Sequence, residues 1–220
     1  MRPSRPLLFA LLGGAACAPA VPPIAPPLGA PPPAPAPASA FVAGRGGTFR
    51  SERFNLRLPL PDGDAWRIDD HGSSWLTAAH AASSSTLVVR AWHEDGRATR
   101  ARCEDQARLR RALPERGAAE ILQDRGLDAP AGFDTRLLVG IVAPRPGAPL
   151  GAFAVAFGSR GHRCFAWAFT TSAAGPGAER VLGERLAAMI EGSLSRVVIE
   201  SDLTPRIERE PARPRAVDQR

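Results

Sequence analysis

The chain has 220 residues, which is enough for one domain with terminal extensions, and 44% of them are hydrophobic, an ordinary fraction for a protein with a packed core. All 28 basic residues are arginine, against 22 acidic residues, and the net charge of +6 is spread evenly: +2 in residues 1–40, +2 in residues 41–203 and +2 in residues 204–220. This even spread argues against nucleic acid as a partner, because nucleic-acid-binding proteins concentrate basic charge on one face.

The first 17 residues have the order of parts that is typical of a bacterial export signal. Arg2 and Arg5 give a positively charged start, residues 7–16 form an apolar run, and small residues precede Cys17. A permanent membrane-spanning helix needs roughly 20 apolar residues, so this run is too short to be one. The sequence therefore predicts that the protein is exported.

Cys17 and the residues before it resemble the lipobox of bacterial lipoproteins. Ala15 and Ala16 match that motif, whereas Gly14 stands where a leucine is usual. The resemblance implies that Cys17 carries lipid and becomes the mature N-terminus. Because no charged residue closely follows Cys17, it also implies an outer-membrane lipoprotein facing the periplasm. The alternative is an ordinary signal peptide cut near Cys17, which would leave a soluble periplasmic or secreted protein.

Residues 18–40 consist almost entirely of alanine, proline, valine, leucine and glycine. Proline fixes φ and removes a backbone donor, so this composition favours extended polyproline II geometry over packing. We expect a disordered, semi-rigid tether that reaches on the order of 70 Å, at about 3.1 Å per residue. A proline-rich ligand for a partner module is the alternative.

Residues 41–200 are expected to form the folded domain, and its first half consists mainly of predicted strands. Alternating or β-branched patterns predict strands at residues 48–50, 54–58, 66–68, 75–79 and 86–92. The third and fourth should form a hairpin around Asp70, His71 and Gly72. Residues 98–113 lack glycine and proline and predict a helix, with Thr99 as its N-cap.

The second half of the domain is predicted to contain more strands and a closing helix. Strands are expected at residues 133–142, 151–158 and 162–171, with Gly158 and Gly161 in a tight link between the last two. Residues 177–194 predict an amphipathic helix in which Leu182 and Leu186 belong to the apolar stripe and Arg185 lies off it. Residues 201–220 are expected to be a disordered tail.

This order of elements predicts an α+β fold: an antiparallel sheet of about six or seven strands flanked by two main helices. The order, together with Phe49, the segment Phe54-Asn55-Leu56-Arg57-Leu58-Pro59 and Trp66, resembles the Mog1/PsbP-like superfamily. The resemblance covers about residues 45–198. It implies a non-enzymatic accessory or assembly factor, and it transfers no functional residue.

The chain contains three cysteines. If Cys17 takes lipid, Cys103 and Cys164 remain as an even pair in an oxidising compartment. A helix lying across a sheet can bring Cys103 and Cys164 close enough for a disulfide. Two buried free thiols are the alternative.

Residues that carry chemistry are present without a recognisable catalytic, metal or cofactor motif. The four histidines, His71, His80, His93 and His162, lack metal-ligand spacing. Gly158-Ser159-Arg160-Gly161 has the wrong spacing for a nucleophile elbow. The four tryptophans lie in predicted strands and are expected in the core: Trp66, Trp75, Trp92 and Trp167. We therefore predict no catalytic, cofactor-binding or metal-binding residue.

Arginines gather around the mid-chain helix, where Arg100, Arg108 and Arg111 can share part of one face. Guanidinium groups bind phosphate and carboxylate well, so this face is a candidate anion-binding site for an acidic partner or anionic lipid. Interleaved Glu104 and Asp105 make a solvated, internally paired helix face the competing interpretation.

Together these features predict a lipid-anchored, non-enzymatic interaction or assembly module. Its partners would be the membrane, through the lipid, and an unidentified protein of the cell envelope. An envelope hydrolase with a pocket on the open face of the sheet is one alternative. A small-ligand or anionic-lipid-binding protein that uses the arginine helix is the other.

Overall fold

The computed structural model describes residues 41, 46–109, 119–142 and 148–200. The predicted export signal with Cys17, the tether, Arg111 and the tail lie outside these residues. None of the helices in the described part of the chain is long and apolar enough to cross a membrane.

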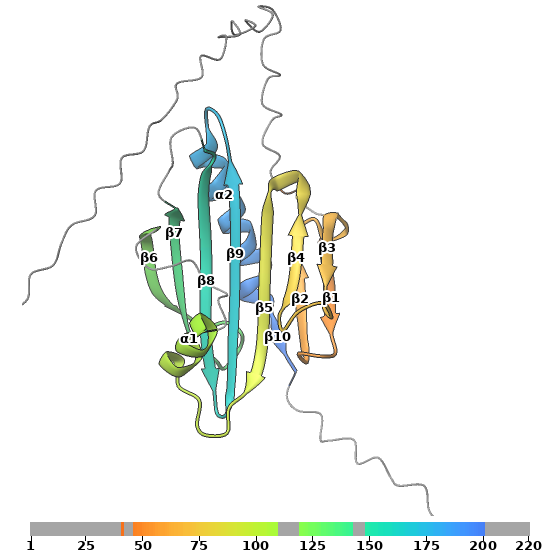
Figure 1. Cartoon of the computed structure of the whole chain (residues 1–220), viewed down its shortest axis with the longest axis vertical. Coiled ribbons are helices and arrows are strands. Elements are labelled where there is room, and N and C mark those ends of the chain that lie inside the picture. Colours follow the sequence, from red (N-terminus) through yellow and green to blue (C-terminus); the bar gives the residue numbers. More distant parts are fainter. Residues whose placement is uncertain (1–40, 42–45, 110–118, 143–147, 201–220) are drawn as a thin grey trace, which may run out of the picture. The chain divides into compact units, whose positions relative to one another are not determined.

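The main sheet has seven antiparallel strands in the order β3-β4-β5-β9-β8-β7-β6 (Figure 1). Their bounds are β3 (Trp66–Asp69), β4 (Leu76–His80), β5 (Ser85–His93), β6 (Ala119–Leu127), β7 (Asp134–Val142), β8 (Leu150–Arg160) and β9 (Arg163–Ala173). A second sheet has the order β1-β2-β10, from β1 (Gly47–Ser51), β2 (Leu56–Leu60) and β10 (Val198–Ile199). The predicted α+β fold is therefore confirmed, with the strands divided between two sheets.

Two α-helices and three short 3-10 turns complete the described fold. The helices are α1 (Arg100–Leu109) and α2 (Ala178–Gly192), and the turns are η1 (Gly63–Ala65), η2 (Ala81–Ser83) and η3 (Leu194–Arg196). Thr99 caps α1 as predicted, because its Oγ1 accepts a hydrogen bond from the backbone N–H of Arg102 at 3.3 Å.

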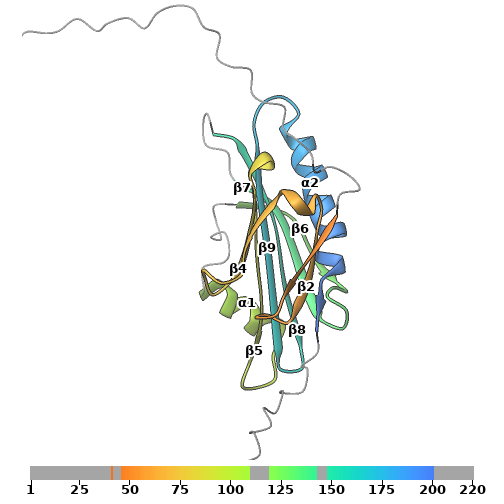
Figure 2. The same cartoon turned by 90° about the vertical axis from the view of Figure 1, so that its right-hand side faces the viewer.

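The two faces of the main sheet are covered differently, as Figure 2 shows in an edge-on view. One face packs against α2 and the small sheet. Leu56, Leu58 and Leu60 of β2 join this main core. The other face carries α1, whose Ala107 belongs to a second core cluster with Phe153, Val155 and Phe157 of β8.

The centre of the main sheet alternates large and small side chains between β8 and β9. On the α2 face, Ala154 lies opposite Phe169 and Ala156 lies opposite Trp167. On the α1 face the sizes are reversed, and Phe157 of β8 lies opposite Ala166 of β9. Each large ring therefore has space above its cross-strand neighbour, which gives close packing on both faces.

Strands β6 and β2 show how the structure differs from the sequence prediction. Strand β6 was not expected, because its side chains are exposed on both faces and its sequence lacks apolar alternation. Strand β2 starts two residues after the predicted position and continues through Pro59 to Leu60. Its neighbour β10 pairs only with Leu56 and Arg57, so Pro59 lies where one side of the strand has no ladder to interrupt.

Candidate functional site

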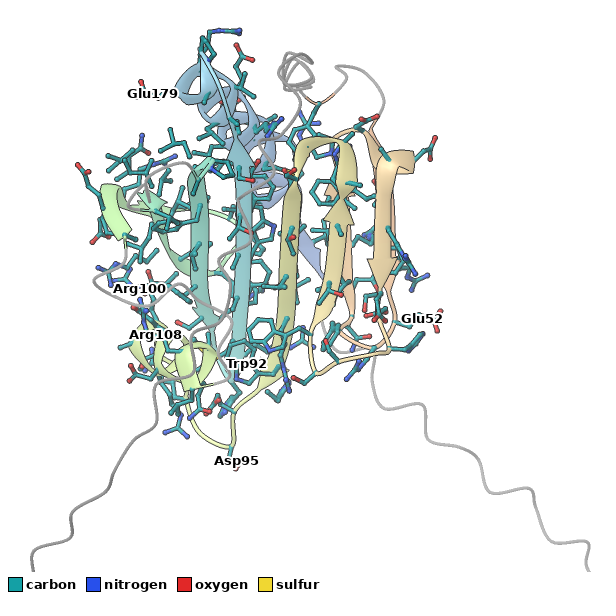
Figure 3. The ribbon with its side chains drawn as sticks, turned by 45° about the horizontal axis from the view of Figure 1, so that its top comes forward. Glu52, Trp92, Asp95, Arg100, Arg108 and Glu179 are labelled. Carbon is teal, nitrogen blue, oxygen red and sulfur yellow. A yellow bond between two sulfur atoms is a disulfide. The ribbon has the colours of Figure 1, made fainter. Side chains whose placement is uncertain are left out.

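The α1 arginine cluster, defined as Arg100, Arg102, Arg108 and Arg136, faces carboxylates. Arg100 Nη1 lies 2.9 Å from Asp134 Oδ1, and Arg102 Nε lies 2.5 Å from Glu94 Oε2. Figure 3 shows Arg100 and Arg108 at the α1 end of the sheet. Of the predicted anion site, Arg100 and Arg108 thus have separate carboxylate partners, and Arg111 lies outside the described residues. Anion binding by this helix stays a prediction.

Glu104 is the centre of this cluster. Its side chain is only 7% exposed, and it receives hydrogen bonds from Arg108 on Oε1 and from Arg136 on Oε2. Arg136 also forms a two-bond pair with Asp124, at 2.8 and 2.6 Å. These bonds lower the pKa of Asp124 and, with Glu104, raise the pKa of Arg136. The cluster ties α1 to β7 and β6.

A disulfide joins Cys103 of α1 to Cys164 of β9, as predicted. The two Cα atoms are 5.3 Å apart, and both residues are fully buried beside Ala98. The bond fixes α1 covalently to a central strand of the main sheet.

A chain of buried polar side chains at the opposite end of the sheet was not anticipated. It runs from Asp62 to His80 Nε2 (3.2 Å), from His80 Nδ1 to Ser83 Oγ (2.7 Å) and from Ser83 Oγ to Ser85 Oγ (2.7 Å). It continues from Ser85 to Thr171 Oγ1 at 2.9 Å. His80, Ser83, Ser85 and Thr171 are each at most 4% exposed.

Arg185 closes this polar chain from the α2 side. Its Nη1 donates to Ser83 O at 2.8 Å, to Ser172 O at 2.9 Å and to Thr171 Oγ1 at 3.1 Å. Arg185 is 2% exposed, so its predicted place off the buried stripe is wrong. Carbonyl and hydroxyl acceptors compensate its desolvation, although burial still lowers its pKa.

Two left-handed residues shape the backbone around His80. Asp62 has φ 55° before η1, and Ser84 has φ 47° after η2. Aspartate and serine are short polar residues, and aspartate tolerates this conformation comparatively well. Next to Asp62, a Cβ on Gly63 would lie 2.4 Å from the backbone N of Gly47, so only glycine permits this close approach of the loop to β1.

Asp62, His80 and Ser83 have the residue types of a serine hydrolase triad, but their geometry serves a structural role. Ser83 is three residues from His80 and bonds its Nδ1 locally, across the η2 turn. The Ser83 Oγ is buried and already within 2.7 Å of both His80 and Ser85. A substrate carbonyl cannot reach it in this conformation, as a nucleophile would require. The hydrogen bonds of this polar chain hold η2, β9 and α2 together.

The remaining histidines do not join His80. His71 follows Asp69 in a turn where Asp69 Oδ1 accepts the backbone N–H groups of His71 and Gly72, which lowers the pKa of Asp69. His162 Nδ1 lies 3.0 Å from Gly96 O. His93 is at the end of β5, exposed. Within the described ranges, no group of three His, Cys, Asp or Glu side chains is placed to hold a metal ion.

Three of the tryptophans predicted for the core are buried. Trp66, Trp75 and Trp167 are 6%, 7% and 0% exposed, and Trp75 precedes β4 rather than lying in it. Trp92 is half-buried beside Trp75, with ring centroids 6.5 Å apart.

Sequence signals existed for part of the polar chain. His80 continues the buried alternation of Leu76 and Ala78 in β4, which marks it as an inward-facing residue. Arg185 follows Leu182 by three residues and precedes Met189 by four, so helical spacing also places it on the buried side. The charge of Arg185 favours an exposed position, whereas its spacing favours a buried one.

No family model and no curated protein matches the sequence. Solved structures similar to this chain include a Bacteroides thetaiotaomicron protein (10% identity, TM-score 0.43, covering 72% of this chain and 50% of that one). They also include a variant of the protein Mog1 (9%, 0.47, 70% and 95%) and the Saccharomyces cerevisiae Ran-binding protein Mog1p (9%, 0.45, 70% and 95%). This chain spans half the length of the Bacteroides protein. At such identities the likeness concerns the fold alone.

Proposed function

We propose that this protein is a lipid-anchored, non-enzymatic interaction module of the cell envelope. Cys17 carries the lipid, residues 18–40 form the tether, and the folded domain faces the periplasm from the outer membrane. Its partner is an envelope protein that docks on the exposed hairpin of β6 and β7.

The exposed apolar side chains of this hairpin carry the proposal. Ile121 is 48% exposed, Leu122 is 56% exposed and Val142, opposite Ala119, is 39% exposed. They make up three of the five large hydrophobic side chains that are exposed in the described residues. Exposed apolar side chains concentrated on one pair of neighbouring strands favour contact with a protein partner.

Strand β6 is also the edge of the main sheet, and its features favour a selective contact. A bulge interrupts its register with β7 between Ile121 and Gln123, and Glu120, Asp124 and Arg125 add charges. Bulges and charges protect an edge strand against indiscriminate pairing. A partner that docks here has to match both the apolar side chains and the charges.

The disulfide supports the proposed compartment. Disulfides persist in the periplasm and outside the cell and are rare in the cytosol. Because Cys103 and Cys164 pair with each other, this disulfide does not involve the third cysteine, Cys17, which agrees with the proposed lipid on that residue.

The anchor is tested by the intact mass of the protein extracted from membranes. We expect a diacyl or triacyl addition on a chain that begins at Cys17, and the loss of two hydrogens at the disulfide. Cys17→Ser should release the domain from the membrane fraction. An unmodified mass in membrane extracts would contradict the lipid anchor. It would not affect the proposed docking surface, which is tested separately.

The docking surface is tested by a photo-crosslinking side chain at position 122, with position 67 as the matched control. Both positions are exposed and lie on opposite edge strands of the main sheet. We expect a discrete protein adduct in intact cells from position 122 only, and its loss when Ile121→Asp is added. Equal adducts from both positions, or an adduct that Ile121→Asp leaves unchanged, would contradict the proposal.

A further inference from the structure

Phe41 directly follows the predicted tether and packs onto the folded domain. The centre of its ring lies 5.2 Å from that of His80, edge to face, 5.8 Å from that of Trp66 and 6.3 Å from that of Phe169. These three partners come from three different strands of the main sheet, β4, β3 and β9. Phe41 is itself half-buried and packs against the main core. A side chain that precedes every described strand therefore has a defined seat on the sheet.

The seat of Phe41 is built from side chains that other contacts hold in place. Trp66 Nε1 donates to Pro61 O at 2.7 Å, and the centre of the Trp66 ring lies 5.2 Å from that of His80. Both ring nitrogens of His80 lie within hydrogen-bond distance of groups in the polar chain. A seat that is already ordered requires little reorganisation when a ring enters or leaves it. Phe41 can therefore be released without a rearrangement of the sheet.

Phe41 also lines a surface cavity of about 580 Å³, together with residues of β1, β2 and α2. Asp62 lines the same cavity, and its Oδ2 lies 3.2 Å from His80 Nε2. His80 is not among the described lining residues and is only 2% exposed. The Phe41 ring thus borders the cavity and also contacts the imidazole that the cavity does not reach.

The polar chain behind Phe41 is the place where η2, β9 and α2 meet, at the end of the main sheet opposite to α1 (Figure 1). Arg185 of α2 donates there to Thr171 Oγ1 of β9 and to Ser83 O of η2. Buried hydrogen bonds are stronger than hydrogen bonds that compete with water. Water that enters beside His80 would therefore weaken the contact between α2 and the sheet.

We propose that Phe41 is a latch between the tether and the polar chain. In its seat, Phe41 keeps water from His80; out of its seat, it admits water and loosens the packing of α2 at this end of the domain. Tension on residues 18–40 acts on Phe41 before it reaches β1, so a stretched tether opens the latch. The role of the tether rests on the proposed function, whereas the shielding of His80 does not.

The shielding is tested by the reaction of the full chain with diethyl pyrocarbonate, which acylates accessible imidazole groups, followed by peptide mass spectrometry. In the parent protein, the exposed His71 should react and the buried His80 should not. Phe41→Ala should raise the rate at His80 about tenfold and leave the rate at His71 unchanged, because the reaction of a buried group follows the population of its open form.

Phe49→Ala is the matched control. Phe49 is also a half-buried phenylalanine that packs against the main core, but it lies on β1 opposite Leu58. Urea denaturation should show a loss of stability in both variants, and only Phe41→Ala should expose His80 by more than its unfolded fraction accounts for. Should Phe41→Ala fail to fold, Phe41→Leu replaces it, with a smaller rise at His80. An unchanged rate at His80, or equal rises in the Phe41 and Phe49 variants, would overturn the latch.

The link to the tether is tested by pulling single molecules of the full chain between positions 20 and 220. Before the domain unfolds, we expect a step on the order of 20 Å as residues 41–46 are released, at roughly 3.3–3.6 Å per residue. Phe41→Ala should abolish this step and Phe49→Ala should retain it. Unfolding of the parent without an early step, or a step that Phe41→Ala leaves unchanged, would overturn the coupling. Neither result bears on the lipid at Cys17, which the intact mass measures.

Discussion

Two groups of arginines in this domain form ion pairs at different depths. In the α1 arginine cluster, carboxylates of Glu94, Glu104, Asp124 and Asp134 face the guanidinium groups, and Glu104 is only 7% exposed. In the small sheet, Arg50 and Arg57 pair with Glu200, and both arginine side chains are more than half exposed. The first arrangement fixes a helix on a sheet, whereas water screens the second. Burial of the ion pair, rather than arginine content, decides how much each group contributes to stability.

Loss of the disulfide that joins α1 to β9 should lower the free energy of unfolding more than the other changes described below. Replacing both Cys103 and Cys164 by serine should lower the free energy of unfolding by about 4 kcal/mol, because the cross-link closes a long loop. Urea denaturation followed by tryptophan fluorescence measures it, and reduced parent protein should match the variant. A loss below about 1 kcal/mol would mean that the ionic contacts alone hold α1.

Glu104→Gln should be the next most damaging change, since it leaves Arg108 and Arg136 facing an uncharged group at a site that is 7% exposed. Breaking a buried ion pair costs about 3 kcal/mol. The exposed neighbour Asp105 supplies the control, because Asp105→Asn should change the free energy of unfolding by less than about 0.5 kcal/mol. Similar losses of stability in both variants would contradict a central role of Glu104 in the α1 arginine cluster.

Acid should weaken the α1 arginine cluster through Asp124. The hydrogen bond from Arg136 lowers the pKa of Asp124 in the folded state below its ordinary value of 3.8. The stability that the ionised Asp124 carboxylate contributes is therefore complete above that ordinary value, and it is lost as the pH falls through the lower, folded-state pKa. Unfolding curves measured from pH 5 downwards should lose less stability in Asp124→Asn than in the parent. Equal losses of stability in the variant and the parent as the pH falls would contradict this role of Asp124.

The smallest effect on stability is expected at Glu200. Glu200→Gln removes the charged partner of Arg50 and Arg57, whose side chains are more than half exposed, so the free energy of unfolding should change by less than about 1 kcal/mol. Urea denaturation of the variant beside the parent measures the change. A loss as large as that of Glu104→Gln would contradict the difference between exposed and buried ion pairs.

A helix or strand can be predicted from sequence when its apolar side chains follow one regular spacing. Strand β5 and the β8–β9 hairpin were predicted because β-branched or apolar runs fill them. Strand β6 was not, because a strand exposed on both faces carries no such pattern. Strand β10 has only two residues, Val198 and Ile199, and is defined by its pairing with β2.

The polar chain shows why sites are harder to predict than elements. His80 and Ser83 are local neighbours, but Arg185 meets Ser83 from 102 residues away in sequence. Sequence patterns place a charged residue outside by default, and only the tertiary acceptors reveal that it is buried. The disulfide was predictable because cysteine pairing has few alternatives once Cys17 is set aside.

The alternation of rings and alanines between β8 and β9 also restricts how this domain can change over evolutionary time. A larger residue in place of Ala156 would collide with Trp167, and a smaller one in place of Trp167 would leave a hole above Ala156. Each position therefore becomes free to vary only when its neighbour varies in the opposite direction. Relatives of this chain should carry paired exchanges at these positions, with the summed side-chain volume preserved.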